Sequence, residues 1–106
     1  MTSFAEVLKT LPSVATIERV ELMDASGSVV AQIENKPGQA GSLAVYHHLL
    51  REHGRIDAAA ANAGLHLYAE HTDDARRSPG KHPNIDRLLA IAAGAAALSG
   101  QVTPKV

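Results

Sequence analysis

Histidine is confined to one part of this chain of 106 residues. The six histidines all lie between residues 47 and 82, and they are His47, His48, His53, His66, His71 and His82. Imidazole is the side chain most readily used for proton transfer and metal ligation near neutral pH. Any acid–base or metal chemistry of this chain is therefore expected in that segment.

Two of the histidines have a glutamate four residues further on, a spacing that places both side chains on one face of a helix. The pairs are His48 with Glu52 and His66 with Glu70. Two such pairs, joined by His82, could enclose a divalent ion such as zinc, manganese, iron or nickel. The alternative is that both pairs are solvated helix contacts, because the helical periodicity places them on outer faces. The sequence therefore offers a candidate metal set but predicts no cofactor.

The catalytic candidates are His53, His71 and Asp73. His53 is expected on the apolar face of a helix, in its last turn, and His71 flanks an apolar stripe. Asp73 and its neighbour Asp74 could hold an imidazole in one tautomer. Without an identifiable nucleophile beside them, partly buried histidines of structural origin are the competing interpretation.

Two segments have the composition of small-anion sites. One is a glycine-rich turn before a helix, where free backbone donors attract anions, and the other is a basic loop before a second helix. The candidate residues are Lys36, Gly38, Gly41, Ser42, Arg76, Arg77, Lys81 and Arg87. The competing interpretations are an ordinary Pro-Gly turn with a serine cap and a solvated, charged loop.

Composition limits what the chain can do. Ten Lys and Arg stand against eleven Asp and Glu, a balance that makes a nucleic-acid partner unexpected. The absence of cysteine excludes disulfides, thiolate zinc sites and cysteine nucleophiles. No apolar run reaches the roughly 20 residues of a membrane span, and no secretory signal is present, so we expect a cytoplasmic protein without membrane contact. With three aromatic residues the core must rest on Leu, Ile and Val, and so thin a core favours a homodimer.

Local signals predict an α+β fold in one domain, residues 1–106: an N-terminal helix, a β-hairpin, then three or four helices packed on a small antiparallel sheet. Ser3 and Glu6 have the spacing of a capping box. Residues 17–23 and 28–34 alternate like strands around a turn at 24–27.

Helix ends are predicted from capping residues further along the chain. We expect Ser42 to cap a helix that stops at Gly54, and Asp57 to cap the next one. A break is expected at Gly64, and Asn84 is expected to cap the last helix. Residues 93–106 are either a frayed tail or contain an edge strand at 101–106, since Pro104 favours an edge.

Three segments, taken together, resemble a known family. They are residues 4–12, residues 33–48, and residues 67–72 continuing through 79–89. The resemblance is to a small bacterial family of single-domain proteins, about 100 residues long, known only as a domain of unknown function. It spans nearly the whole chain and implies a free-standing cytoplasmic bacterial protein, without implying an activity, a ligand or a catalytic residue.

The leading functional hypothesis is a non-catalytic binding or interaction domain that acts as a homodimer. The alternatives are a metal-dependent or acid–base enzyme that uses the histidine segment and a sensor of small anions such as phosphate or carboxylate. Most imidazoles are expected to point outward on separate surfaces, and their convergence on one cavity would favour the alternatives.

Overall fold

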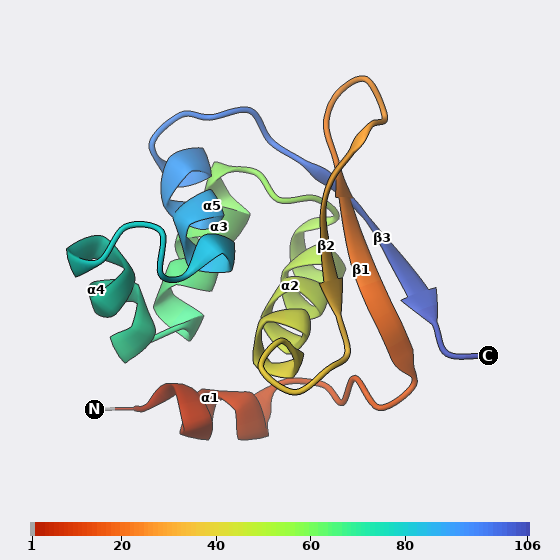
Figure 1. Ribbon diagram of the computed structural model, residues 1–106, viewed down its shortest axis with the longest axis horizontal. Helices are drawn as coiled ribbons and strands as arrows, with labels where there is room; N and C mark the ends of the chain where they lie inside the picture. Colours follow the sequence, from red (N-terminus) through yellow and green to blue (C-terminus); the bar gives the residue numbers. More distant parts are fainter. Residues whose placement is uncertain (1) are drawn as a thin grey trace.

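A three-stranded antiparallel sheet, in the order β2-β1-β3, forms one layer of the molecule (Figure 1). The computed structural model describes residues 2–106, and the strands are β1 (Ile17–Met23), β2 (Val29–Glu34) and β3 (Ser99–Pro104). The Asp24 carboxylate accepts hydrogen bonds from the backbone N–H groups of Ser26 and Ser28, which fixes the turn of the predicted hairpin. The predicted C-terminal edge strand is also confirmed, and it begins two residues earlier than expected. The alternative prediction, a frayed tail, is wrong.

The helices all lie on one side of this sheet (Figure 1). The described residues contain five of them: α1 (Phe4–Thr10), α2 (Ala40–His53), α3 (Ala58–Leu67), α4 (Glu70–Arg77) and α5 (Pro83–Ala92). Helix α2 packs on β1 and β2, α3 packs on α2, and α5 packs on α3, while α4 adjoins α5. This is the predicted α+β architecture. Within residues 2–106 the structure has no helix with the length and apolar character needed to cross a bilayer.

Side-chain alternation along the strands explains why the helices cover one face only. Val20, Leu22 and Ile33 are fully buried under α2. The intervening Arg19 and Glu21 lie on the other face and approach each other to 3.5 Å between Nε and Oε1. Period-2 patterning thus sets which side of the sheet the helices cover.

Three predicted helix ends are confirmed. The Ser3 hydroxyl accepts from the backbone N–H of Glu6, and the Asp57 carboxylate accepts from that of Ala60. Gly54 closes α2 with φ 79°, a left-handed conformation that glycine adopts without strain. Each of these helix ends is determined by residues a few positions away, so the sequence alone is enough to predict it.

Three other predicted ends are wrong. Ser42 does not cap α2, which begins two residues earlier, after Gln39. Asn84 does not cap α5, because Pro83 occupies the first turn and His82 takes the cap position. Helix α3 continues through Gly64, and the chain breaks at Ala69 instead, where φ is 52°. At Ser42 and Gly64 a tertiary contact described below replaces the local signal, whereas at Asn84 the neighbouring proline shifts the cap.

Candidate functional site

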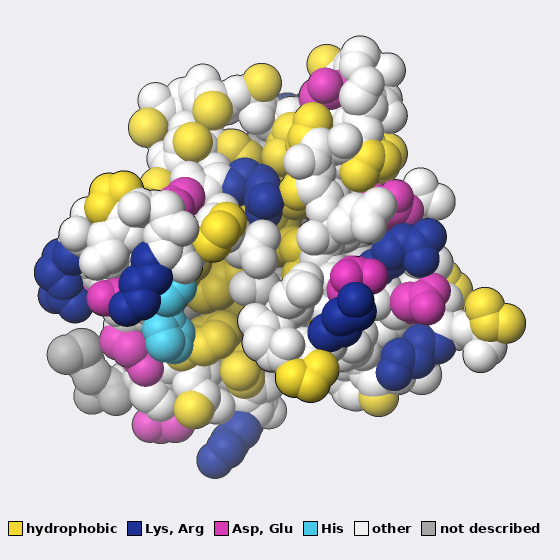
Figure 2. Space-filling view, viewed as in Figure 1, with side chains coloured by type: hydrophobic (Ala, Val, Ile, Leu, Met, Phe, Trp, Pro, Cys, Tyr) yellow, Lys and Arg dark blue, Asp and Glu magenta, His cyan; other side chains and the backbone are white. Residues whose placement is uncertain are grey.

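The N-terminal ends of α2 and α5 meet at an open cavity of about 380 Å³, with α1 along one side. Its lining comes from Gly38 and residues 40–42 before and within α2, residues 81–85 around the start of α5, and Phe4, Tyr68 and His71. Figure 2 shows histidine atoms at the rim of a hollow with apolar side chains on its floor. Segments far apart in the sequence therefore enclose one space.

Both helix ends at the cavity lack a side-chain cap. The backbone N–H groups of Gly41, Ser42 and Asn84 have no hydrogen-bond acceptor within residues 2–106. Unpaired N–H groups at the start of a helix, together with the helix dipole, favour a negative charge. The cavity is therefore lined by two helix starts with unpaired donors, two N–H groups from α2 and one from α5.

Two histidines and a lysine line the cavity on its α4 side. The rings of His71 and His82 lie 5.8 Å apart between centroids. The His82 Nε2 atom is 2.7 Å from the Asp74 Oδ2 atom, and the Lys81 ammonium is 3.1 Å from the same oxygen. Hydrogen bonding from His82 first and from Lys81 second lowers the pKa of Asp74 to about 2. Asp74 thus stays ionised and orients the His82 ring.

Aromatic side chains form another part of the lining, in contact with His71 and Ser42. The Phe4 ring stacks on Tyr68, with 5.2 Å between centroids, and meets the edge of His71 at the same separation. The Tyr68 hydroxyl donates to the Ser42 Oγ atom at 2.7 Å, which leaves the serine proton free for another acceptor. Gly41 permits this arrangement, because a Cβ there would lie 3.2 Å from Phe4 Cε2.

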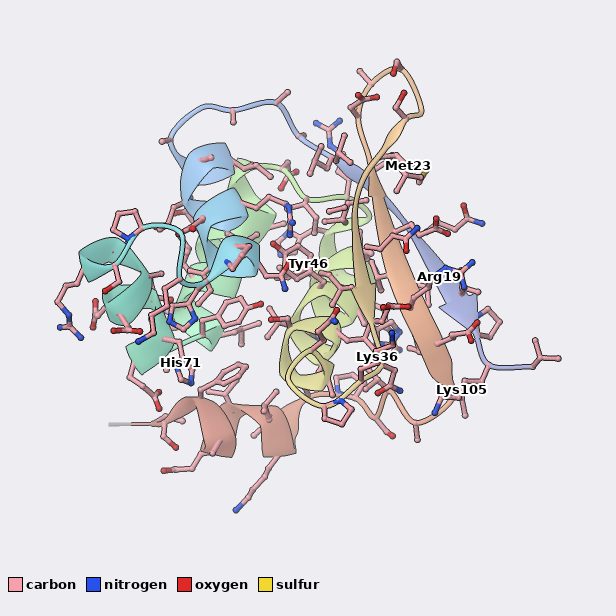
Figure 3. The ribbon with its side chains drawn as sticks, viewed as in Figure 1. Arg19, Met23, Lys36, Tyr46, His71 and Lys105 are labelled. Carbon is pink, nitrogen blue, oxygen red and sulfur yellow. The ribbon has the colours of Figure 1, made fainter. Side chains whose placement is uncertain are left out.

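A partly buried polar network connects the two helix ends. Tyr46, which projects from α2, donates its hydroxyl proton to the backbone carbonyl of Asn84 at 2.5 Å. Arg87 donates to the Tyr46 hydroxyl at 3.1 Å and to the Asn84 Oδ1 atom at 2.8 Å. Figure 3 shows Tyr46 between α2 and α5. Arg87 therefore positions the start of α5 instead of lining the cavity.

The comparison with protein families covers this whole site. The model of one family, described as "uncharacterized protein conserved in bacteria (DUF2322)", matches residues 4–102. The chain belongs to the DUF2322 family. No curated protein and no solved structure matches it.

This membership confirms the resemblance to a small bacterial family of single-domain proteins. The DUF2322 match extends over every residue that lines the cavity, from Phe4 to Ile85. The match ends at Val102, inside the edge strand β3. It carries no activity, so the functional argument rests on the geometry of this DUF2322 chain alone.

The structure separates the anion-binding candidates into two groups. Gly38, Gly41, Ser42 and Lys81 line the cavity. Lys36 instead pairs with Glu34 at 2.9 Å on the sheet side, away from His71 in Figure 3.

The other basic candidates lie elsewhere. Arg76 pairs with Asp73 at 3.7 Å and lines a second groove, between α1 and the α3–α4 junction. Arg77 is exposed on α4, and Arg87 belongs to the Tyr46 network. The glycine turn and the residues around Lys81 therefore share one cavity, whereas most of the arginines lie outside it.

The catalytic candidates are similarly divided. Only His71 reaches the cavity. His53 is exposed at the end of α2, so its predicted place on the buried face is wrong, because the last turn of α2 extends beyond the core. Asp73 is exposed. Its neighbour Asp74 contacts an imidazole, but the imidazole is that of His82 and not that of His71.

The candidate metal ligands lie in separate parts of the structure. His82 belongs to the cavity, while His66 and Glu70 line the groove beside α1. The Glu70 carboxylate accepts from the backbone N–H of Phe4 at 2.8 Å. His48 and Glu52 lie on α2 and line neither space. Among residues 2–106 no three His, Asp or Glu side chains are gathered in the arrangement of a metal site.

Sequence reasoning missed four contributors: Phe4, Tyr68, Asp74 and Asn84. Phe4 and Tyr68 carried only a core signal, since their helical spacing is typical of apolar stripes. Asp74 was noticed beside His71, but its partner is eight residues further on and across a loop. Asn84 was predicted to cap a helix. Its contribution to the cavity is a backbone N–H group, which the type of residue does not predict.

Acid stability provides a test of the Asp74 contacts. Because folding lowers the pKa of Asp74 from 3.8 to about 2, its stabilisation is complete above about pH 4 and is lost as the pH falls toward 2. We expect melting temperatures of Asp74→Asn to fall less steeply than those of the wild type between those pH values. Asp73→Asn, the adjacent exposed position, should keep the wild-type slope. Equal slopes for Asp74→Asn and the wild type would contradict the contacts.

Proposed function

We propose that this protein binds a small anionic ligand, with a phosphate or carboxylate group, in the cavity between α2 and α5. The observation that carries the proposal is the convergence in one cavity of two uncapped helix ends with Lys81, His71 and His82. Helix ends and cationic side chains that face the same space are the usual elements of phosphate and carboxylate recognition.

Charge and hydrogen-bonding capacity both support the proposal. Lys81 is largely exposed at its ammonium end, so it can turn from Asp74 to a ligand without disturbing the core. The free Ser42 proton and the N–H groups of Gly41 and Asn84 add neutral donors that suit an anion's oxygens.

Binding of phosphate or acetate to the purified protein, against chloride at equal ionic strength, tests the proposal directly. We expect saturable binding at one site by calorimetry and a rise in melting temperature, because a ligand that binds only the folded state stabilises it. Lys81→Gln should weaken binding about tenfold, the effect of losing one charge-assisted contact worth about 1.4 kcal/mol.

Lys36→Gln is the matched control. It removes the same charge near the start of α2, but from a side chain paired with Glu34 outside the cavity. Its affinity should equal that of the wild type. An absence of saturable binding by the wild type, or equal losses in the two variants, would contradict the proposal.

A second candidate function, acid–base catalysis on the bound anion, is favoured by the contact between His82 and Asp74. A carboxylate 2.7 Å from an imidazole nitrogen fixes the ring in one tautomer, as in many general bases. Asp74→Asn separates the two functions. For a binding protein the variant frees Lys81 and His82 and raises anion affinity, whereas for an enzyme it lowers turnover of a chromogenic phosphate or acetate ester.

Self-association and a cytoplasmic location stay predictions. The surface we propose for a homodimer is the β2 edge, where Val29 and Val30 are each about half exposed. An exposed edge strand with apolar side chains is a ready template for pairing with a second copy.

A further inference from the structure

We infer that the ligand is an organic anion whose charged head lies at the two helix ends and whose flat, ring-sized apolar body lies against Phe4. This inference rests on the proposed anion site and specifies the chemical class of its ligand. It follows from the size of the cavity and the nature of its walls.

The cavity is too large for an anionic head alone. Its volume of about 380 Å³ lies within the range of about 300–1,000 Å³ typical of small-molecule sites. A free phosphate or carboxylate group is no larger than a few waters, so most of the space remains for the rest of the ligand.

The additional space has apolar and aromatic walls. Phe4 and Tyr68 are stacked with an interplanar angle of 25°, and Pro83 and Ile85 also line the space. Tyr68 is almost completely buried, whereas the Phe4 ring is partly exposed. An aromatic ring with an accessible face or edge favours contact with another flat apolar group.

Phe4 lies where the wall of the cavity can adjust its position when a ligand binds. Helix α1 buries none of its residues, and the backbone N–H of Phe4 is held by the Glu70 carboxylate. A segment with few buried contacts opens at low free energy. The Phe4 ring can therefore move with α1 to accommodate the body of a ligand while the helix ends stay fixed.

The test compares probes that share one head group. Binding of phenylphosphonate, methylphosphonate and inorganic phosphate is measured by calorimetry at one pH and ionic strength, and benzoate against acetate repeats the comparison with a carboxylate. We expect phenylphosphonate to bind at least tenfold more tightly than methylphosphonate or phosphate. Phe4→Ala should reduce this preference to less than threefold.

Val7→Ala is the matched control, because Val7 lies on the same helix but lines the other groove. It should keep the tenfold preference. If Phe4→Ala does not fold, Phe4→Leu keeps the apolar packing but removes the ring, and the preference should still fall.

The outcomes separate this inference from the anion site itself. Equal affinities for phenylphosphonate and phosphate overturn the inference and leave the anion site standing. A phenyl preference that persists in Phe4→Ala and Phe4→Leu overturns the place assigned to the ring. If none of the probes binds, the anion site fails, and this inference fails with it.

Discussion

Both tyrosines should remain un-ionised in the folded protein at pH values where exposed tyrosine titrates. Burial raises the pKa of Tyr46 from 10.0 to about 12, with the nearby Arg87 opposing the shift, and burial raises the pKa of Tyr68 as well. Because folding favours the protonated phenol, the stabilisation is complete below about pH 10 and is lost as the pH rises toward 12. A shift of two units corresponds to roughly 3 kcal/mol for Tyr46 alone, a large share of the stability of a small domain.

The measurement is a titration followed by tyrosinate absorbance and by far-ultraviolet circular dichroism. The chain has two tyrosines and no tryptophan, so the absorbance is simple to interpret. We expect tyrosinate to appear only as the helical signal is lost, in one transition, whereas the protein in urea titrates near pH 10. Tyr46→Phe, as control, should halve the absorbance change. Tyrosinate formation near pH 10 with the helical signal intact would contradict the burial of these rings.

Sequence reasoning succeeded mainly where an element depends on contacts within a few residues, although it missed the effect of Pro83 on the start of α5. The capping residues Ser3 and Asp57, the glycine at Gly54 and the hairpin turn each satisfy backbone groups close to themselves. Alternation along residues 17–23 was enough to place the strand and its buried face. Such signals predicted the α+β fold and nearly all of its elements.

The site could be predicted only in pieces. Gly41, Ser42 and Lys81 were identified as anion-binding candidates, but nothing in their spacing indicates that residues 40–42 and 81–85 line the same cavity. Their meeting depends on the contact between Tyr46 and Asn84, which lie 38 positions apart in the chain. Ser42 was predicted to cap its helix, yet its hydroxyl accepts from Tyr68, a partner that local pattern cannot reveal.

Gly64→Val should destabilise the protein more than the introduction of valine at an exposed position of α3. A Cβ at this position would lie 2.7 Å from Leu88 Cδ1 and 2.8 Å from Leu49 Cδ1, and both leucines are fully buried. The glycine therefore serves a close approach of α3 to α2 and α5, which explains why it does not end the helix. Overpacking of this kind costs about 3 kcal/mol, with a fall in melting temperature of more than about 10 °C.

Ala59→Val is the matched control, since it adds a β-branched side chain at an exposed position of the same helix and should cost about 0.5 kcal/mol. Valine at Gly64 also pushes α5 away from α2, which stretches the hydrogen bond between Tyr46 and Asn84. Anion affinity of the folded variant, measured well below its melting temperature, should therefore fall, whereas that of Ala59→Val should not. Equal stabilities of the two variants would contradict the close packing at Gly64. Equal affinities would mean that the packing of α3 does not set the distance between the helix ends at the cavity.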